Sequence, residues 1–101
     1  MYARLEQHND MIEWDDRKRN ETLKTRGLDF ADINLVSWDI ALTIEDVRQN
    51  YSEARFITYA PIRNRLCVFA WCYRGENIRV ISLRKANERE IARYDKYEAL
   101  H

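Results

Sequence analysis

The sequence LCVFAWCY, residues 66–73, is almost wholly apolar and has the length of a β-strand. A strand with one face in water alternates apolar and polar residues, whereas a strand covered on both faces reads as a continuous apolar run. We therefore predict that residues 66–73 form the central strand of a β-sheet that is buried on both sides.

The segments around this strand have the properties of further strands. RGEN, residues 74–77, predicts a tight hairpin turn with Gly75 that leads into a last strand over residues 78–83. On the N-terminal side, a turn is expected at residues 61–65 and a polar loop at residues 45–53. Alternating or β-branched segments predict three more strands, over residues 11–14, 40–44 and 54–60.

Two helices are predicted in the N-terminal half. Asp15 and Asp16 are suited to cap a highly charged helix that ends near Arg26, and the following Gly27 can adopt the left-handed conformation that ends a helix. A second helix is predicted over residues 28–38, where apolar residues recur at helical spacing after the capping residue Asp29.

A third helix is predicted at the C-terminus. Asn87 is followed three residues later by Glu90, which is the spacing of a capping box. The predicted order is therefore β-α-α-β-β-β-β-α. Runs of strands flanked by helices are typical of an α+β fold with an antiparallel sheet, here with two N-terminal helices and one C-terminal helix.

Length and composition favour one globular domain over residues 1–101. No apolar run approaches the roughly 18 residues of a membrane span, and the N-terminus has no signal-peptide pattern, so we expect a cytoplasmic protein without a membrane partner. Cys67 and Cys72 differ by an odd number, which on one strand places them on opposite faces as separate reduced thiols.

The net charge of zero hides an asymmetry along the chain. Residues 1–53 hold 12 acidic and 7 basic side chains, whereas residues 54–101 hold 5 acidic and 10 basic ones. Such a split is compatible with a basic patch for an anionic partner, and equally with both signs mixed on one solvated surface.

Basic residues gather at the junction RVISLRKANERE, residues 79–90, where the last strand meets the last helix. Strict strand alternation places Arg79 and Lys85 on one face and Arg84 on the other. The planar guanidinium fork of arginine fits a phosphate group, and the N-terminus of a helix adds N–H donors, so the junction predicts an anion site. The alternative is that Arg84, Arg89 and Arg93 form surface ion pairs with Glu88, Glu90 and Asp95.

Other chemical motifs are absent from the sequence. The two histidines, His8 and His101, lie near the ends of the chain and form no Cys/His zinc motif or histidine triad. There is no glycine-rich phosphate loop. We therefore predict neither a metal nor a cofactor.

The chain resembles the BrnT family, the toxins of BrnT/BrnA toxin–antitoxin modules, from about Ile12 to Tyr94. Four segments carry the resemblance, and the last of them is the most specific: EWDDRKRNETLKTRGLDFADI (13–33), ALTIED (41–46), ARFITYA (54–60) and RVISLRKANEREIARY (79–94). Residues 1–11 extend beyond the usual start. Many members carry KHG where this chain has TRG, so Arg26 stands in the place of a histidine.

The resemblance implies a compact RelE-like ribonuclease that cleaves RNA without a metal and arrests growth. It also implies neutralisation by a cognate BrnA antitoxin in a 2:2 complex. The ribbon-helix-helix domain of that antitoxin binds operator DNA, so the toxin would reach DNA only through it. A catalytically inactive relative and an RNA-binding or partner-binding module are the alternatives.

RNA cleavage without a metal needs activation of the 2′-hydroxyl, stabilisation of charge at phosphorus and protonation of the leaving oxygen. Under this interpretation Arg79, Arg84 and Lys85 hold the phosphate together with Arg55 of a neighbouring strand. Glu90 or Tyr94 transfers a proton, although Glu90 can equally be only a capping residue. We further predict that Lys18 and Arg26 of the first helix contact the RNA backbone or help at the chemistry, and that Arg89 and Arg93 of the last helix contact RNA.

Overall fold

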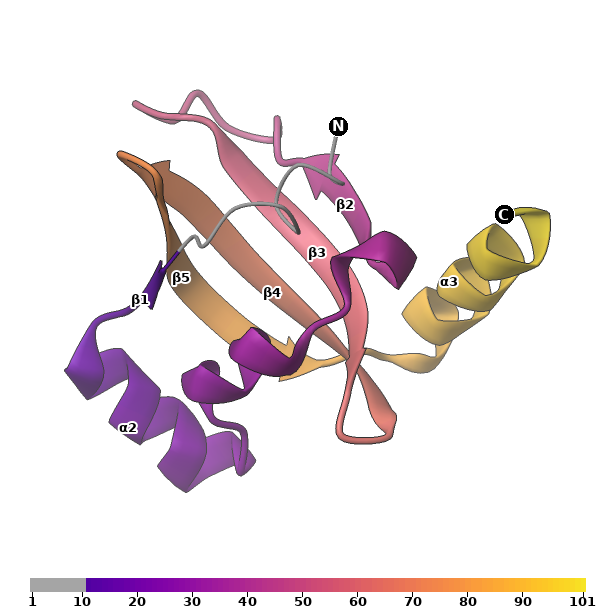
Figure 1. The fold of residues 1–101 in the computed structure, drawn as a ribbon, viewed down its shortest axis with the longest axis horizontal. Coiled ribbons are helices and arrows are strands. Elements are labelled where there is room, and N and C mark those ends of the chain that lie inside the picture. Colours follow the sequence, from indigo (N-terminus) through magenta and orange to yellow (C-terminus); the bar gives the residue numbers. More distant parts are fainter. Residues whose placement is uncertain (1–10) are drawn as a thin grey trace.

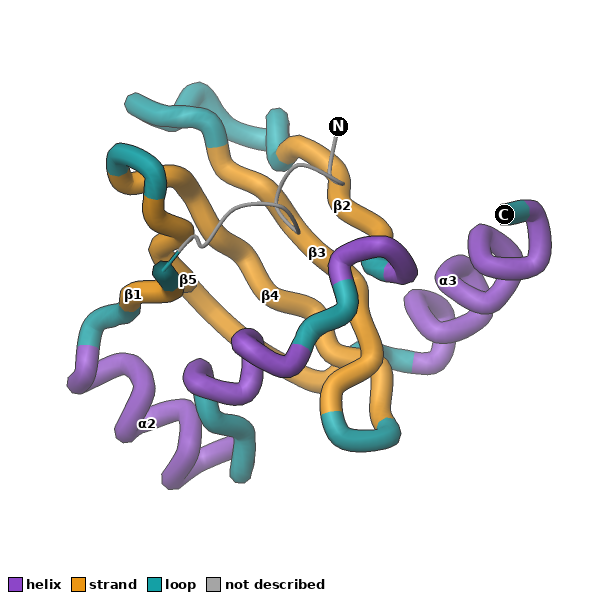
Figure 2. Tube along the Cα trace, in the orientation of Figure 1, coloured by secondary structure: helices purple, strands orange, loops and turns teal. Residues whose placement is uncertain are grey.

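Five strands form one sheet in the order β1-β5-β4-β3-β2 in the computed structural model, which describes residues 11–101 (Figures 1 and 2). The predicted extension at residues 1–11 and His8 lie outside the described residues, apart from Met11. The strands are β1 (Ile12–Glu13), β2 (Leu42–Glu45), β3 (Arg55–Ile62), β4 (Arg65–Arg74) and β5 (Asn77–Lys85). The helices are α2 (Asp16–Arg26), the 3₁₀ helices η1 (Phe30–Leu35) and η2 (Trp38–Ile40), and α3 (Glu88–Leu100).

The predicted α+β class is confirmed, and β4 is central as its sequence indicates. Side chains pack on parts of both faces of the sheet, and most of β4 is therefore buried. Its buried residues are Cys67, Val68, Phe69, Trp71 and Cys72. One face carries the larger core, in which Phe30 and Ile33 of η1 pack on residues of β4 and β5. The other face carries a smaller cluster in which Tyr94 of α3 packs on Tyr59 and Val68.

The sheet is mixed rather than wholly antiparallel, which corrects the prediction. β2 to β5 pair antiparallel in sequence order, whereas β1 pairs parallel to β5 through Ile12 with Ile78 and Glu13 with Arg79. Successive strands joined by short turns are constrained to run antiparallel. β1 and β5 are far apart in the sequence and no hairpin joins them, so β1 is free of this constraint and can pair parallel to β5.

The predicted second α-helix is wrong, because the chain forms two 3₁₀ turns there. Phe30, Ile33 and Val36 are all buried, whereas Leu35 is exposed. Their spacing of three residues matches the three residues per turn of a 3₁₀ helix, in which residues i and i+3 lie on one side. Asp29 caps η1 as predicted, since its side chain accepts a hydrogen bond from the backbone N–H of Ala31.

The other caps are confirmed. The Asp15 side chain accepts hydrogen bonds from the first turn of α2, and Gly27 ends that helix with φ of 70°. At α3, the Asn87 side chain accepts from the Glu90 N–H while the Glu90 side chain accepts from the Asn87 N–H, which is a complete capping box. Each cap satisfies backbone donors or acceptors that a helix end leaves without partners.

The predicted turn at residues 61–65 is shorter than expected. Pro61 and Ile62 still belong to β3, and Arg65 already belongs to β4. Only Arg63 and Asn64 turn, with φ values of 50° and 70°. Positive φ at both central residues is typical of the two-residue hairpin loops whose twist matches that of the strands.

Cys67 and Cys72 are both free and buried. They lie on opposite faces of the sheet, because β4 has no extra residue between them and their separation is odd. None of the helices within residues 11–101 is long and apolar enough to cross a membrane.

A polar triad lies inside the larger core. Thr58 is fully buried and its hydroxyl accepts a hydrogen bond from Trp71 Nε1 at 2.8 Å. The Thr43 hydroxyl lies 2.8 Å from the same oxygen. Three strands are thereby joined through one side-chain oxygen, because Thr43, Thr58 and Trp71 belong to β2, β3 and β4.

We expect Thr58→Val to destabilise the protein by about 1–3 kcal/mol, because the buried Trp71 N–H and Thr43 hydroxyl lose their shared partner. Urea denaturation measures the change. Thr25→Val, the same substitution at an exposed helix position, is the control, with an expected change within about 0.5 kcal/mol. If the two variants unfold at the same urea concentration, the triad does not stabilise the fold.

Candidate functional site

A β-bulge in β5 decides where the arginines of the junction point. Phe69 pairs with Leu83 and Ala70 pairs with Ser82, but the next residue, Trp71, pairs with Val80. Ile81 is therefore an extra residue, and side-chain alternation changes phase across it. As a result Val80 and Leu83 both face the larger core, which strict alternation had placed on opposite faces.

The same change of phase brings Arg79 and Arg84 onto one face of the sheet. Their partners on β4 are Cys72 and Val68, which have the same parity and so share a face. Ser82 lies between them opposite Ala70. The prediction that Arg79 and Arg84 point in opposite directions is therefore wrong, because it assumed an unbroken strand.

β3 adds a third arginine to this face. Arg55 pairs with Cys72, and Cys72 pairs on its other side with Arg79. With neighbouring strands about 4.8 Å apart, the Cα atoms of Arg55 and Arg79 are about 10 Å apart. We call Arg55, Arg79, Ser82 and Arg84 the arginine face. It lies on the side of the sheet opposite η1.

Arg84 is held by the helix that follows it. Its Nη1 donates to Glu90 Oε1 and its Nη2 donates to Glu90 Oε2, each at 2.8 Å. The Arg84 guanidinium and the Asn87 N–H lower the pKa of Glu90 to about 2, against the opposing effect of burial. The surface ion pair that the sequence left as an alternative therefore forms for Arg84. Glu90 also serves as a cap.

Arg79 has a looser carboxylate partner. Its Nη1 lies 3.4 Å from Glu13 Oε1, while the other oxygen of Glu13 accepts a shorter hydrogen bond of 2.8 Å from the Asn77 side chain. Glu13 belongs to β1, so the parallel pairing of β1 with β5 places this carboxylate beside Arg79. Sequence reasoning missed Glu13, since nothing in a two-residue strand indicates its pairing partner.

Arg55 is covered by the loop between β2 and β3. Its guanidinium carbon lies 4.4 Å from the centre of the Tyr51 ring, which is within cation–π distance. Arg55 Nε is buried, and no hydrogen-bond partner for it is found among the described residues. Tyr51 was not predicted as a site residue, because a single aromatic residue in a polar loop gives no periodic signal.

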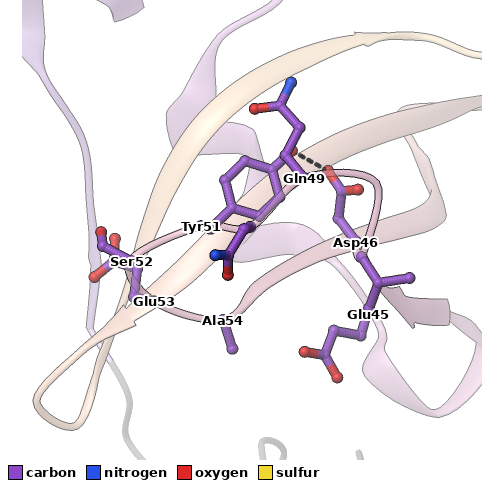
Figure 3. Close-up of a pocket in the computed structure, with 9 residues that line it drawn as sticks. Glu45, Asp46, Gln49, Tyr51, Ser52, Glu53 and Ala54 are labelled. Atoms are coloured by element: carbon purple, nitrogen blue, oxygen red, sulfur yellow. Dashed lines mark hydrogen bonds between the residues drawn. The ribbon is translucent and has the colours of Figure 1, made fainter.

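Asp46 organises this loop. It accepts hydrogen bonds from Arg48 Nε and Nη2, each at 2.8 Å, and from the Tyr51 hydroxyl at 2.9 Å, drawn as a dashed line in Figure 3. The Arg48 guanidinium holds the pKa of Asp46 well below its usual range. An open surface pocket of about 370 Å³ lies along the loop and is lined by residues 45–54 apart from Arg48.

The remaining predicted residues are not part of the arginine face, although Tyr94 packs on the same side of the sheet against Val68, the strand partner of Arg84. Lys85 pairs with Cys67 on the opposite side of the sheet, and Lys18 is exposed on α2. Arg26 Nη1 donates to the backbone carbonyl of Leu83 at 2.9 Å, which ties the end of α2 to β5. The buried Tyr94 hydroxyl donates to the carbonyl of Ile40 at 2.6 Å, and burial raises the pKa of Tyr94.

Arg89 and Arg93 are exposed on α3. The structure therefore places Arg55, Arg79 and Arg84 on one face of the sheet, with Glu90 paired to Arg84 and Tyr94 packed beside Val68 on that face. Lys18 and Lys85 lie elsewhere.

Residues 14–90 match the family described as the ribonuclease toxin BrnT of type II toxin–antitoxin systems. The chain belongs to the BrnT family. The matched region includes the arginine face and ends at Glu90. A comparison with curated proteins finds no match.

The fold of this BrnT-family chain is similar to that of the ribonuclease toxin BrnT from Brucella abortus, whose crystal structure was determined at 1.1 Å resolution. The TM-score is 0.60 with 22% sequence identity, over 79% of this chain and 100% of the Brucella chain. At this identity the comparison supports the fold, and it assigns no role to individual side chains.

The environment of Glu90 predicts a distinctive titration. We expect the Glu90 carboxyl to titrate with a pKa of about 2, and Arg84→Ala to move that pKa back toward the ordinary value of 4.5. The stabilising effect of a lowered carboxyl pKa is present above pH 4.5 and is lost as the pH falls toward 2. Carbon-13 NMR of the side-chain carboxyls measures the pKa, and Arg89→Ala is the control because Arg89 makes no hydrogen bond to Glu90. An unchanged pKa in Arg84→Ala would contradict this cause.

Proposed function

We propose that this chain is an endoribonuclease that cleaves RNA without a metal ion and thereby arrests growth. The observation that carries the proposal is the bulge at Ile81, which places Arg79 and Arg84 on the same face as Arg55. Membership of a ribonuclease toxin family supports RNA as the substrate class. The arginine face is the proposed site at which the scissile phosphate binds.

Arginines can supply the charge stabilisation that this reaction needs. Negative charge builds up on the phosphate oxygens when a 2′-hydroxyl attacks phosphorus. A guanidinium group can donate two parallel hydrogen bonds to these oxygens. Donors that are already oriented toward developing charge each contribute about 10²–10³-fold to the rate. Arg79 and Arg84 are the residues to which we assign this role.

Neither predicted proton-transfer group is free in this structure. Glu90 is ionised at neutral pH, with a pKa of about 2, and its two oxygens accept hydrogen bonds from Arg84. The hydroxyl of Tyr94 donates a hydrogen bond to the backbone carbonyl of Ile40. We therefore propose that charge stabilisation by the arginine face is the main catalytic contribution, and that Glu90 acts through Arg84.

Four basic residues outside the face are proposed to contact the RNA backbone. Arg89 and Arg93 extend from the arginine face along α3, and Lys18 and Arg26 lie on α2. Arg26 also fixes α2 to β5 through the Leu83 carbonyl. An anchoring arginine can replace the usual histidine at this position only if the histidine is not required for proton transfer.

The partner that we propose is a BrnA-type ribbon-helix-helix antitoxin in a 2:2 complex. It would link the toxin to operator DNA, which the toxin does not contact itself. The type II family assignment supports an antitoxin partner. We place the complex in the cytoplasm, where cellular RNA and the operator are both accessible.

Production of the protein alone in a bacterial host is expected to stop growth and fragment total RNA. Co-production with the product of the adjacent gene is expected to restore growth. Growth curves and RNA gels measure both effects. Normal growth with intact RNA, from protein that is soluble and folded, would contradict the toxin proposal and favour an inactive relative that acts in operator control.

Arg79→Ala and Arg84→Ala are each expected to lower the rate of RNA cleavage by about 10²-fold or more, because each removes oriented charge from the phosphate site. The control is Arg63→Ala, which removes an exposed arginine that pairs with Asp32. Cleavage of a fluorescent RNA oligonucleotide is followed with and without excess EDTA. Loss of wild-type cleavage in EDTA would refute metal independence, and full activity in both alanine variants would refute the phosphate site.

A further inference from the structure

The hydrogen bonds of Arg84 leave one defined edge of its guanidinium group open. A guanidinium has five N–H donors. Nη1 donates to Glu90 Oε1 and to the carbonyl of Lys85, at 2.8 Å and 3.2 Å, and Nη2 donates to Glu90 Oε2 at 2.8 Å. Glu90 therefore occupies the edge of the guanidinium group that Nη1 and Nη2 form. The Nε–H and the second Nη2–H remain without a partner among residues 11–101.

These two remaining donors form the side fork of arginine, which is a geometry that binds oxyanions. The same fork is used three times elsewhere among the described residues, and one of these cases is Arg63, which donates from Nε and Nη2 to Asp32. Arg48 donates from Nε and Nη2 to the two oxygens of Asp46, and Arg19 donates from the same two atoms to Asp29. The Arg84 side chain is 46% exposed, so its fork is accessible to a ligand.

Glu90 is the reason that the fork has a fixed direction. Its side chain is only 11% exposed. Its Oε1 also accepts the Asn87 N–H at 2.9 Å, which anchors the carboxylate to the first turn of α3. A flexible arginine side chain is thus held at its end by a carboxylate that is itself held by the backbone. An arginine held in this way loses less conformational entropy when it binds a ligand than a freely rotating arginine does.

We propose that the side fork of Arg84 binds a phosphate group of the RNA and that Glu90 is the positioning residue that aims it. This inference rests on the proposed function, because it takes the scissile phosphodiester as the ligand. It replaces the proton-transfer role considered for Glu90. It also explains how one glutamate serves both the capping box and the site, since both functions use the same fixed carboxylate.

Inorganic phosphate tests the open fork without any cleavage reaction. In nitrogen-15 NMR spectra, the Nε–H resonance of Arg84 is expected to shift as phosphate is added. The resonance of Arg63 is an internal control, because Asp32 already occupies its fork. Absence of a shift at Arg84 would overturn the proposal. A shift at Arg84 in a protein that does not cleave RNA would support the fork while refuting the proposed function.

Three variants test the positioning role by cleavage kinetics. Glu90→Gln keeps an acceptor for the Asn87 N–H but loses the charge, and is expected to lower kcat by about 10²-fold with a smaller change in KM. Arg84→Lys keeps the charge but loses the fork, with a similar expected loss. Asn87→Ala removes the side-chain acceptor of the Glu90 N–H but keeps the backbone N–H that holds Glu90 Oε1, so it is expected to lower kcat by less than Glu90→Gln does.

The combination of variants separates positioning from proton transfer. If Glu90 acts through Arg84, Glu90→Gln in the Arg84→Lys background is expected to cause no further loss, because residues that act as one unit are non-additive. A full additional loss would overturn the proposal and support independent proton transfer. A loss in Asn87→Ala equal to that in Glu90→Gln would also overturn the proposal, because a weakened N-terminus of α3 would then be enough to explain both losses.

Discussion

One extra residue in β5 determines the arrangement of the candidate site. Without the bulge at Ile81, strand alternation would direct Arg84 into the layer of η1 and would remove Leu83 from the larger core. With it, Val80 and Leu83 both pack into that core, and Arg79 and Arg84 share the opposite face. The packing requirement of the core and the chemistry of the arginine face are thus met by the same irregularity, as is common for bulges next to active sites.

The arginines of this face are ordered by different neighbouring elements. Glu13 of β1 contacts Arg79, Tyr51 of the β2–β3 loop covers Arg55, and Glu90 of α3 pairs with Arg84. A cation that is already oriented needs little reorganisation when a phosphate group arrives, which is why oriented groups are effective in catalysis. The elements around the sheet therefore serve the site by holding side chains as well as by covering the core.

Ion pairs connect the acidic first half of the chain with the basic second half. Of the six ion pairs among residues 11–101, three join an acidic residue of the first half to an arginine of the second, namely Asp32 to Arg63, Glu53 to Arg74 and Glu13 to Arg79. At these three positions, acidic residues of the first half and arginines of the second half lie side by side in the folded protein.

The sequence by itself determined the parts of this protein that depend on local physics. The central strand followed from its apolar run, and the caps at Asp15, Asp29 and Asn87 followed from side chains that bond to nearby backbone. Only the tertiary structure decided which arginines act together, that β1 pairs parallel, and that residues 30–40 form 3₁₀ turns. The bulge at Ile81 arises because both Val80 and Leu83 must reach one core, and that requirement depends on residues of β4 and η1 that are distant along the chain. Contacts between distant segments carry no signal in the local pattern, so the partners of Arg79 and Arg55 could be found only in the folded molecule.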